Sequence, residues 1–393
     1  HGTSRRQRQM CIRDSDQIDV LYSVEEETTG SLGGNIGYSD FGLMLGFNLQ
    51  EQNFLGSGNT VGIGINKSIY NEVYNISFLD PYATKDAVSL GYNIYFRETD
   101  YGEFNIANYL TNSAGFGAQF GYPISDTQRL SFNLTYDKTD IDIGSLPARE
   151  IYDFVAAEGN VFETLSAGVS WQTVTLNRGL FPTDGASTSL SLSSTVPGSD
   201  LNYYRINLRQ RYYQPLSSDL IFGFQGELGY LSAYGETEET PFFQNFYAGG
   251  PRSLRGFESN TLGPRSTDAP CYEFNYEEGT CPNLLDTDGD GELDSPYYNP
   301  YANNTSRYRD APIGGNIKVE GSLQMIFRLP FIEDQRSMRS AFFFDFGNVF
   351  SDNCKDYQIN CYKPSIDDLR YSYGVGITWI TGFGPMSFAI SKP

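Results

Sequence analysis

The sequence predicts an all-β protein, specifically an antiparallel β-barrel that spans a membrane. Apolar and polar side chains alternate along many segments, which is typical of strands whose two faces meet different surroundings. The chain has 41 glycines and 29 tyrosines among 393 residues, which favours strands and turns over helices. No run of about 18 apolar residues occurs, so transmembrane helices are excluded.

Charge and histidine content exclude other classes of protein. The formal net charge of −21 argues against a nucleic-acid partner, because phosphates need a basic surface. The single histidine, His1, is the first residue of the sequence. Most acid–base and nucleophilic sites use histidine, so we predict that the protein is not an enzyme.

The alternation predicts about fifteen strands. Segment 128–138 is an example, because it places Leu130, Phe132, Leu134 and Tyr136 on one face and polar residues on the other. Segment 370–379 repeats this pattern with Tyr371, Val375 and Trp379 facing outward. The predicted strands are 30–40, 41–52, 58–68, 72–80, 86–98, 113–124, 128–140, 162–177, 187–197, 202–215, 218–232, 314–328, 338–350, 368–382 and 383–392.

The connections favour a membrane barrel over a soluble sandwich. Short turns recur at 80–86, 122–128, 214–219, 329–335 and 382–385, and they alternate with mostly longer, polar and acidic segments at 99–113, 138–162, 233–313 and 351–367. Short periplasmic turns opposite long external loops are typical of outer-membrane barrels. Phe343, Phe344, Phe346 and Phe350 cluster near a strand end, as an interfacial girdle requires.

One motif points to a family. Residues 246–265 read FYAGGPRSLRGFESNTLGPR, and their core, Arg255-Gly256-Phe257, resembles the signature of the BamA family of outer-membrane-protein assembly factors. The segments 48–64, 177–185 and 342–350 resemble that family as well. The resemblance covers about 16–393. It implies a 16-stranded barrel in which a long sixth external loop, here 233–313, folds back into the lumen.

The resemblance also implies a division of the chain. Residues 30–393 would form the barrel, and residues 16–29 resemble the end of the last POTRA domain, a periplasmic module. Residues 1–15 are basic, unlike the chain that follows, and we interpret them as a non-native leader. Because single-chain bacterial barrels have even strand numbers, fifteen strands predict that a final strand is missing.

The family pairs the motif arginine with acids on the inner barrel wall. One of these positions matches Asp345, whereas the other matches Gln324, which carries no charge. Glu320 lies four residues earlier on the same face, so we predict Asp345 and Glu320 as the partners of Arg255. Such pairing is needed because an unpaired guanidinium inside a barrel is costly.

The resemblance implies that the protein inserts and folds other barrel proteins in the bacterial outer membrane, with its N-terminus in the periplasm. Its partners would be unfolded outer-membrane clients, accessory lipoproteins of an assembly complex, and the lipid bilayer. In the family the first and last strands form a weak seam, the lateral gate. The first predicted strand has four glycines that weaken its register, Gly30, Gly33, Gly34 and Gly37, although they would also suit a bend at a barrel corner. A client strand would add to it by β-augmentation.

Four cysteines lie in predicted external loops, where disulfides form. Of their three pairings, the simplest joins Cys271 to Cys281 and Cys354 to Cys361. Within loop six, Asp286, Asp288, Asp290 and Asp294 are spaced as in a calcium-binding loop, but Tyr297 stands where the last carboxylate belongs. A calcium site and a solvated acidic loop are therefore both open, and no other cofactor is expected.

Two other functions remain open at this point, and a hydrolase that uses carboxylates alone ranks behind them, because no acid pair is placed for it. Two-partner-secretion exporters and TamA-like translocation proteins share the same loop motif, so the chain could be a transporter of that kind. A passive porin is the alternative of another class. It predicts an open, conducting lumen, whereas a lumen filled by loop six predicts little conductance.

Overall fold

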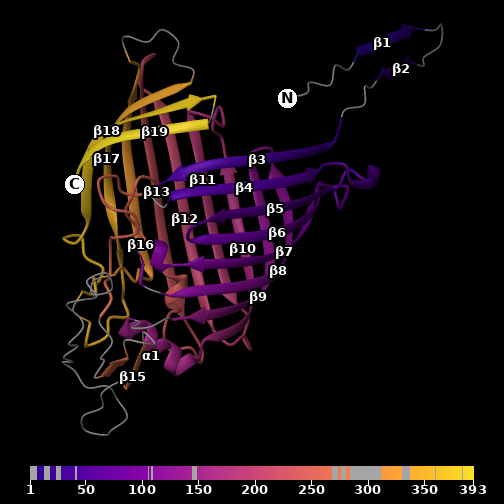
Figure 1. Cartoon of the computed structure of the whole chain (residues 1–393). Helices are drawn as coiled ribbons and strands as arrows, with labels where there is room; N and C mark the ends of the chain where they lie inside the picture. The colour runs from indigo at the N-terminus through magenta and orange to yellow at the C-terminus, as the bar shows by residue number, and fades with distance from the viewer. Residues whose placement is uncertain are drawn as a thin grey trace.

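In the computed structural model of the chain, one antiparallel sheet of fifteen strands dominates, as Figure 1 shows. The structure describes residues 7–12, 18–23, 28–39, 42–104, 106–107, 109–143, 148–267, 273–275, 280–283, 311–329, 337–358, 360–382 and 384–393. Among these residues no helix is long and apolar enough to cross a membrane.

The fifteen strands pair in chain order, and the ends of the sheet are β3 and β19. Their bounds are β3 Gly30–Ser39, β4 Gly42–Glu51, β5 Thr60–Ser68, β6 Asn71–Asp80, β7 Ser89–Asp100, β8 Leu110–Ser125, β9 Gln128–Asp142, β10 Val161–Val174, β11 Gly185–Thr195, β12 Tyr203–Pro215, β13 Leu220–Ala233, β16 Ile317–Phe327, β17 Met338–Phe350, β18 Arg370–Thr381 and β19 Gly384–Lys392. The predicted strands and the barrel fold class are thus confirmed.

The remaining elements are short. In the described part of the chain one α-helix occurs, α1 (Arg149–Glu158); it lies between β9 and β10, where the sequence predicts only a loop. Three 3-10 turns cover Phe54–Gly56, Gly102–Phe104 and Phe242–Gln244. Two further pairs of strands stand outside the main sheet: β1 (Gln7–Ile12) with β2 (Ile18–Ser23), and β14 (Glu273–Asn275) with β15 (Thr280–Asn283). In the first pair, β1 lies in the predicted leader, residues 1–15, and β2 lies in the predicted POTRA segment, residues 16–29.

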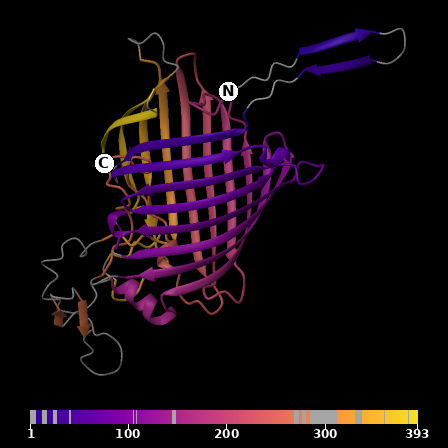
Figure 2. The same ribbon diagram turned by 45° about the vertical axis from the view of Figure 1, so that its right-hand side comes forward.

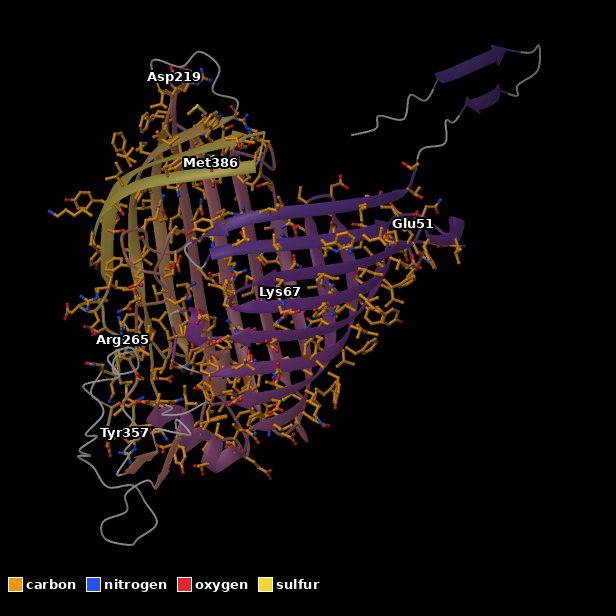
Figure 3. All side chains as sticks on the ribbon, in the orientation of Figure 1. Glu51, Lys67, Asp219, Arg265, Tyr357 and Met386 are labelled. Atoms are coloured by element: carbon orange, nitrogen blue, oxygen red, sulfur yellow. A yellow bond between two sulfur atoms is a disulfide. The ribbon has the colours of Figure 1, made fainter. Side chains whose placement is uncertain are left out.

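The sheet curls back on itself, so that its first half, β3–β9, faces its second half (Figures 1 and 2). Strands of the two halves cross at a steep angle in these views, which follows from the strand tilt and twist of a curled sheet. The short turns gather at one end, the turn end, where Figure 3 labels Asp219. Arg265 and Tyr357 lie at the opposite end, the loop end (Figure 3).

The two faces of the sheet differ as the alternation predicts. On β9, Phe132, Leu134 and Tyr136 are 48%, 47% and 43% exposed, whereas Ser131 on the other face is buried. This outer apolar face has no packing partner among the described residues, so it suits lipid contact. The girdle prediction is wrong for two residues. Phe343 is buried because it points inward and contacts Arg255 of loop six, and Phe350 is buried as well.

Arginine substitutions on the two opposite faces of the sheet test this assignment. Leu134→Arg places a charge on the outer face, and we expect it to lower the free energy of unfolding in lipid vesicles by about 2–4 kcal/mol. Gln119→Arg is the matched control, because Gln119 lies on the neighbouring strand β8 and lines a cavity on the inner side of the sheet. That variant should change stability by less than about 0.5 kcal/mol. Equal losses from both variants in urea titrations would contradict the assignment of faces.

Candidate functional site

The connection between β13 and β16, called loop six below, folds back against the inner face of the sheet. Its two described ends pair with each other, since Phe246 N–H donates to Gly315 C=O at 2.8 Å and Gly315 N–H donates to Phe246 C=O at 3.1 Å. Arg265 N–H donates to Asn360 C=O at 3.0 Å, in the connection after β17. Backbone hydrogen bonds therefore hold the two ends of loop six together and join loop six to the connection after β17.

Arg255 holds the tip of loop six to β17. Its Nε and Nη2 donate to the two carboxylate oxygens of Asp345, at 2.7 and 2.6 Å, and its backbone N–H donates to Asp345 Oδ2 at 3.1 Å. The Asp345 side chain is fully buried. The guanidinium lies 3.4 Å from the Phe343 ring centroid, and its Nη2 donates to Ser322 Oγ at 2.9 Å. A buried carboxylate needs such a bidentate partner, because desolvation otherwise penalises its charge.

Apolar packing surrounds this ion pair. Leu254 is completely buried in a cluster that joins loop six to the wall, and Phe257 packs against the edge of that cluster. The buried members are Leu231, Phe246, Ala248, Leu254, Leu262 and Val349. This packing excludes water from the loop backbone, which strengthens the electrostatic contact of Arg255 with Asp345.

Two glycines let the loop lie close to the wall. Gly256 has φ +94°, and a Cβ at this position would stand 3.0 Å from Ser391 Oγ on β19. Gly263 has φ +101°, and its Cβ would stand 2.8 Å from the Cβ of Val349 on β17. Positive φ favours glycine, and the short distances leave no room for a side chain. Gly256 therefore brings the motif against the last strand of the sheet.

Glu320 is not a partner of Arg255. It accepts hydrogen bonds from Ser253 Oγ at 2.8 Å and forms an ion pair with Lys318 at 2.9 Å. Lys318 also pairs with Glu227 on β13, at 3.3 Å. Ser253 lies two residues before Arg255, so Glu320 supports the same loop through another residue. The prediction of an Arg255–Glu320 pair is corrected, because the nearby Lys318 supplies the positive charge that Glu320 needs.

Gln324, which matches the family's second acidic position, is linked to Arg255 through Ser322. Its Nε2 donates to Ser322 Oγ at 3.3 Å, and the same oxygen accepts from Arg255. Ser322, Ser253 and Phe343 were not predicted as site residues. Ser322 on β16 and Phe343 on β17 contact Arg255, and Ser253 of loop six contacts Glu320; all three contacts depend on how loop six folds.

The four predicted gate glycines lie on β3, at one edge of the sheet. β3 pairs with β4 over all ten of its residues, from Gly30 opposite Glu51 to Ser39 opposite Gly42. A Cβ would meet Asn48 Oδ1 at 2.6 Å at Gly33, Glu51 Oε2 at 3.0 Å at Gly30 and Met44 Cε at 3.3 Å at Gly37, whereas Gly34 has more room. Small residues thus permit close contact with β4 along the inner face of this edge strand.

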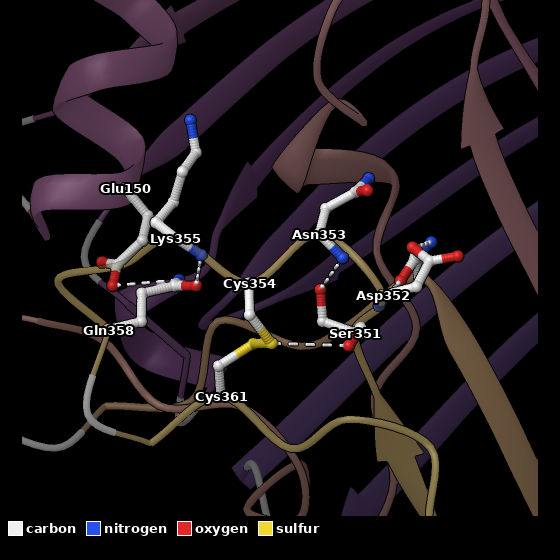
Figure 4. The surroundings of a disulfide bond; sticks show 9 residues. Glu150, Ser351, Asp352, Asn353, Cys354, Lys355, Gln358 and Cys361 are labelled. Atoms are coloured by element: carbon white, nitrogen blue, oxygen red, sulfur yellow. Dashed lines mark hydrogen bonds between the residues drawn. A yellow bond between two sulfur atoms is a disulfide. The ribbon is translucent and has the colours of Figure 1, made fainter.

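At the loop end, α1 contacts loop six and the connection after β17. Cys354 and Cys361 form a disulfide that closes a short hairpin after β17 (Figure 4). Glu150 of α1 accepts from Thr267 N–H of loop six at 3.1 Å and from Gln358 Nε2 of this hairpin at 3.2 Å. Tyr357 donates to Asp153 at 2.7 Å and stacks under Arg149. Burial and the hydrogen bond to Asp153 raise the pKa of the Tyr357 hydroxyl, so it stays a donor.

Some predicted sites lie outside the described residues. Cys271, Asp286, Asp288, Asp290 and Asp294 belong to segment 268–310, and the side chain of Cys281 is not described. The second disulfide and the calcium site therefore stay predictions. Within the described part of the chain, no group of three or more His, Cys, Asp or Glu side chains could hold a metal ion.

Comparison with known proteins agrees with this geometry. The model of the Omp85 superfamily domain matches residues 53–393. The chain is 29% identical to the outer membrane protein assembly factor BamA of Neisseria meningitidis serogroup B, over 96% of this chain and 46% of that protein. The chain thus spans about half the length of that relative. It is 22% identical to the sorting and assembly machinery component 50 homolog of Mus musculus, over 92% of this chain and 67% of that protein.

A solved structure shows the same architecture. The crystal structure of BamA from Haemophilus ducreyi lacking POTRA domains 1–3 superposes with a TM-score of 0.79 at 26% sequence identity. The match covers 100% of this chain and 71% of that one.

Removal of the motif guanidinium should release loop six. Arg255→Ala leaves the buried carboxylate of Asp345 without a countercharge, and we expect a loss of about 3–5 kcal/mol in the stability of the docked loop. Limited proteolysis should then cut loop six much faster. Arg252→Ala is the matched control, because Arg252 is exposed in the same loop. Unchanged protease resistance of the Arg255→Ala loop would contradict the anchoring role of Arg255.

The loop-end contacts should weaken as pH rises. Burial raises the pKa of Glu150 above its ordinary value, so the closed loops bind this proton more tightly than the open loops. The stabilisation is complete below the ordinary pKa of a glutamate and is lost as pH rises through the raised value. We expect faster hydrogen exchange of the Thr267 amide across this range, and Glu150→Gln should abolish the dependence. A wild-type exchange rate that, after correction for intrinsic exchange, stays flat with pH would exclude this role.

Proposed function

The chain belongs to the Omp85 superfamily, and from this premise we propose that it is the membrane barrel of an outer-membrane assembly factor. In this proposal the protein inserts and folds other β-barrel proteins in the bacterial outer membrane. The observation that carries the proposal is loop six with its Arg255–Asp345 anchor, inside a sheet that resembles BamA over its whole length. The names of two relatives, which both describe assembly, support the same role.

The proposed working part is the seam, defined here as the region between the edge strands β3 and β19. Strand β3 pairs with β4 along one side, and its other side is the end of the sheet. Leu32, Ile36 and Tyr38 point outward from it and are 70%, 77% and 84% exposed. An outward apolar face next to an available backbone edge suits an incoming amphipathic strand of a client.

Backbone hydrogen bonding supplies the driving force in this mechanism. Each N–H and C=O of a client strand that lies unpaired in hydrocarbon costs several kcal/mol, so pairing with β3 offsets that cost residue by residue. The inner face of β3 has only small or polar residues, among them Gly33 and Gly37, so few large side chains there resist displacement of the edge. The step needs neither bond cleavage nor a cofactor, so we propose a protein without enzymatic activity.

The proposal includes partners and orientation. The clients are unfolded outer-membrane proteins, and the outer apolar face of the sheet contacts the lipid bilayer. Accessory lipoproteins would bind the periplasmic part, and the N-terminus would lie in the periplasm beside the short turns. A passive porin is disfavoured, because the motif, its apolar cluster and Lys318 with its partners occupy the lumen. The export alternatives are disfavoured by the similarity to assembly factors.

A reversible cross-link across the seam tests this function. Ile36→Cys on β3 and Ile390→Cys on β19 place thiols at positions whose native side chains are 77% and 84% exposed. Joined by a cleavable bifunctional reagent, they should abolish client insertion into vesicles, and reduction should restore it. The parent chain, treated identically, controls for reaction at its own cysteines. Insertion that continues at the full rate through a cross-linked seam would refute the mechanism.

A further inference from the structure

The connection between β10 and β11, residues 175–184, is called the strap here. It is fixed internally by one side chain: Asn177 Oδ1 accepts from Thr183 N–H at 3.1 Å, and its Nδ2 donates to Thr183 Oγ1 at 2.8 Å. The backbone N–H of Asn177 also donates to Asp184 C=O at 3.1 Å. The strap is thus an ordered loop at the turn end, with a shape of its own. The resemblance to the family includes this segment but assigns it no role.

The strap is fastened to a distant strand. Arg339 of β17 donates from Nη2 to the backbone carbonyl of Pro182. Its guanidinium lies 4.8 Å from the ring centroid of Tyr213 on β12 and 5.7 Å from that of Phe181 in the strap. In the sheet, three strands separate β11 from β17, namely β12, β13 and β16. The contact therefore crosses the concave interior instead of following the hydrogen-bonded ladder.

Burial and backbone conformation show that this contact is specific. Pro182 is buried, and Leu176 at the start of the strap packs on a small cluster formed by Tyr213, Ile326 and Ala341. Phe181 has φ +49°, a left-handed conformation that residues with large side chains adopt rarely. Such a conformation persists where the surroundings determine it. Here the surroundings are the Arg339 guanidinium and the fixed carbonyl of Pro182.

The strap also borders the functional site. A cavity of about 430 Å³ is lined by Phe181 and Arg339 together with Arg255 and Phe257 of loop six. Ser387 and Ser391 of β19 line the same cavity. The strap, the motif and the last strand of the sheet thus surround one space at the inner face.

We propose that the strap and Arg339 form a tie across the lumen that sets the curvature of the sheet and hence the separation of β3 and β19. The hydrogen-bonded ladder alone does not set this separation, because the twist between neighbouring strands varies and the variation accumulates across the sheet. A contact that bridges three strands fixes their combined rotation. The tie itself does not depend on the function of the protein. Its consequence, control of the seam, rests on the proposed function.

Distance measurement between the edges tests the tie. Spin labels introduced as unnatural amino acids at positions 36 and 390 report the separation of β3 and β19 from their outer faces, without labelling the native cysteines. The full chain is placed in lipid nanodiscs, and pulsed electron resonance gives the distance distribution. We expect Arg339→Gln to widen this distribution by about a factor of two, because the strands regain independent twist.

Three variants make the result interpretable. Arg328→Gln is the matched control, since Arg328 is an exposed arginine at the same end and pairs with Asp219 at 3.3 Å. It should leave the distribution unchanged. Arg339→Lys keeps a donor but loses the planar stacking on Tyr213 and Phe181, so it should give an intermediate width. If Arg339→Gln does not fold, Phe181→Gly provides the test, because it relieves the backbone conformation and removes the stacking while Arg339 remains.

The outcomes separate the tie from the proposed function. A folded Arg339→Gln or Phe181→Gly chain with the parental distance distribution overturns the tie, whatever its activity. A widened distribution together with an altered rate of client insertion supports both the tie and its control of the seam. If the parent chain inserts no clients, the proposed function fails, and the distance distributions still decide the tie.

Discussion

Backbone hydrogen bonding in hydrocarbon is the constraint on which the rest of the structure depends. A strand that crosses a bilayer must pair every N–H and C=O with a neighbour, because no water is present to replace the missing bonds. Fifteen strands pair with one another in chain order, and in the described part of the chain this sheet ends at β3 and β19. The same constraint explains why an edge strand is a suitable place for another polypeptide strand to bind.

A curled sheet with two edges needs support from inside, and this chain supplies it with two arginines. Arg255 carries loop six to Asp345 on β17, and Arg339 joins the strap to the same strand, nearer the turn end. Both guanidiniums use their planar shape, since each donates hydrogen bonds and also lies over aromatic rings. Strand β17 thus receives contacts from two connections that are far apart in sequence. Loop six and the strap thus occupy part of the lumen at these levels.

Charge placement inside the lumen follows from the cost of burial. Glu320, Lys318 and Glu227 satisfy one another on the wall, so Glu320 is not available to Arg255. Arg255 is instead matched by a single, fully buried aspartate and by the hydroxyl of Ser322. An arrangement of this kind contributes orientation more than net stability, because desolvation consumes much of the Coulombic gain. At the loop end, Glu150 has the same structural role, but its carboxylate accepts backbone and amide hydrogen bonds instead of an ion pair.

The sequence by itself determined the barrel class, the strands and their two faces, because alternation with period two depends only on local residue order and on which side meets lipid. It also placed Arg255 and Asp345 as partners, through resemblance to a family. It could not place α1, whose residues resemble a polar loop until they pack on Phe242 and Phe162. It assigned Phe343 to a girdle and Glu320 to Arg255, and both assignments were wrong. Those contacts, and the reach of Arg339 to Pro182, were decided by the tertiary structure, because the curvature of the sheet brings together side chains that lie tens to hundreds of residues apart.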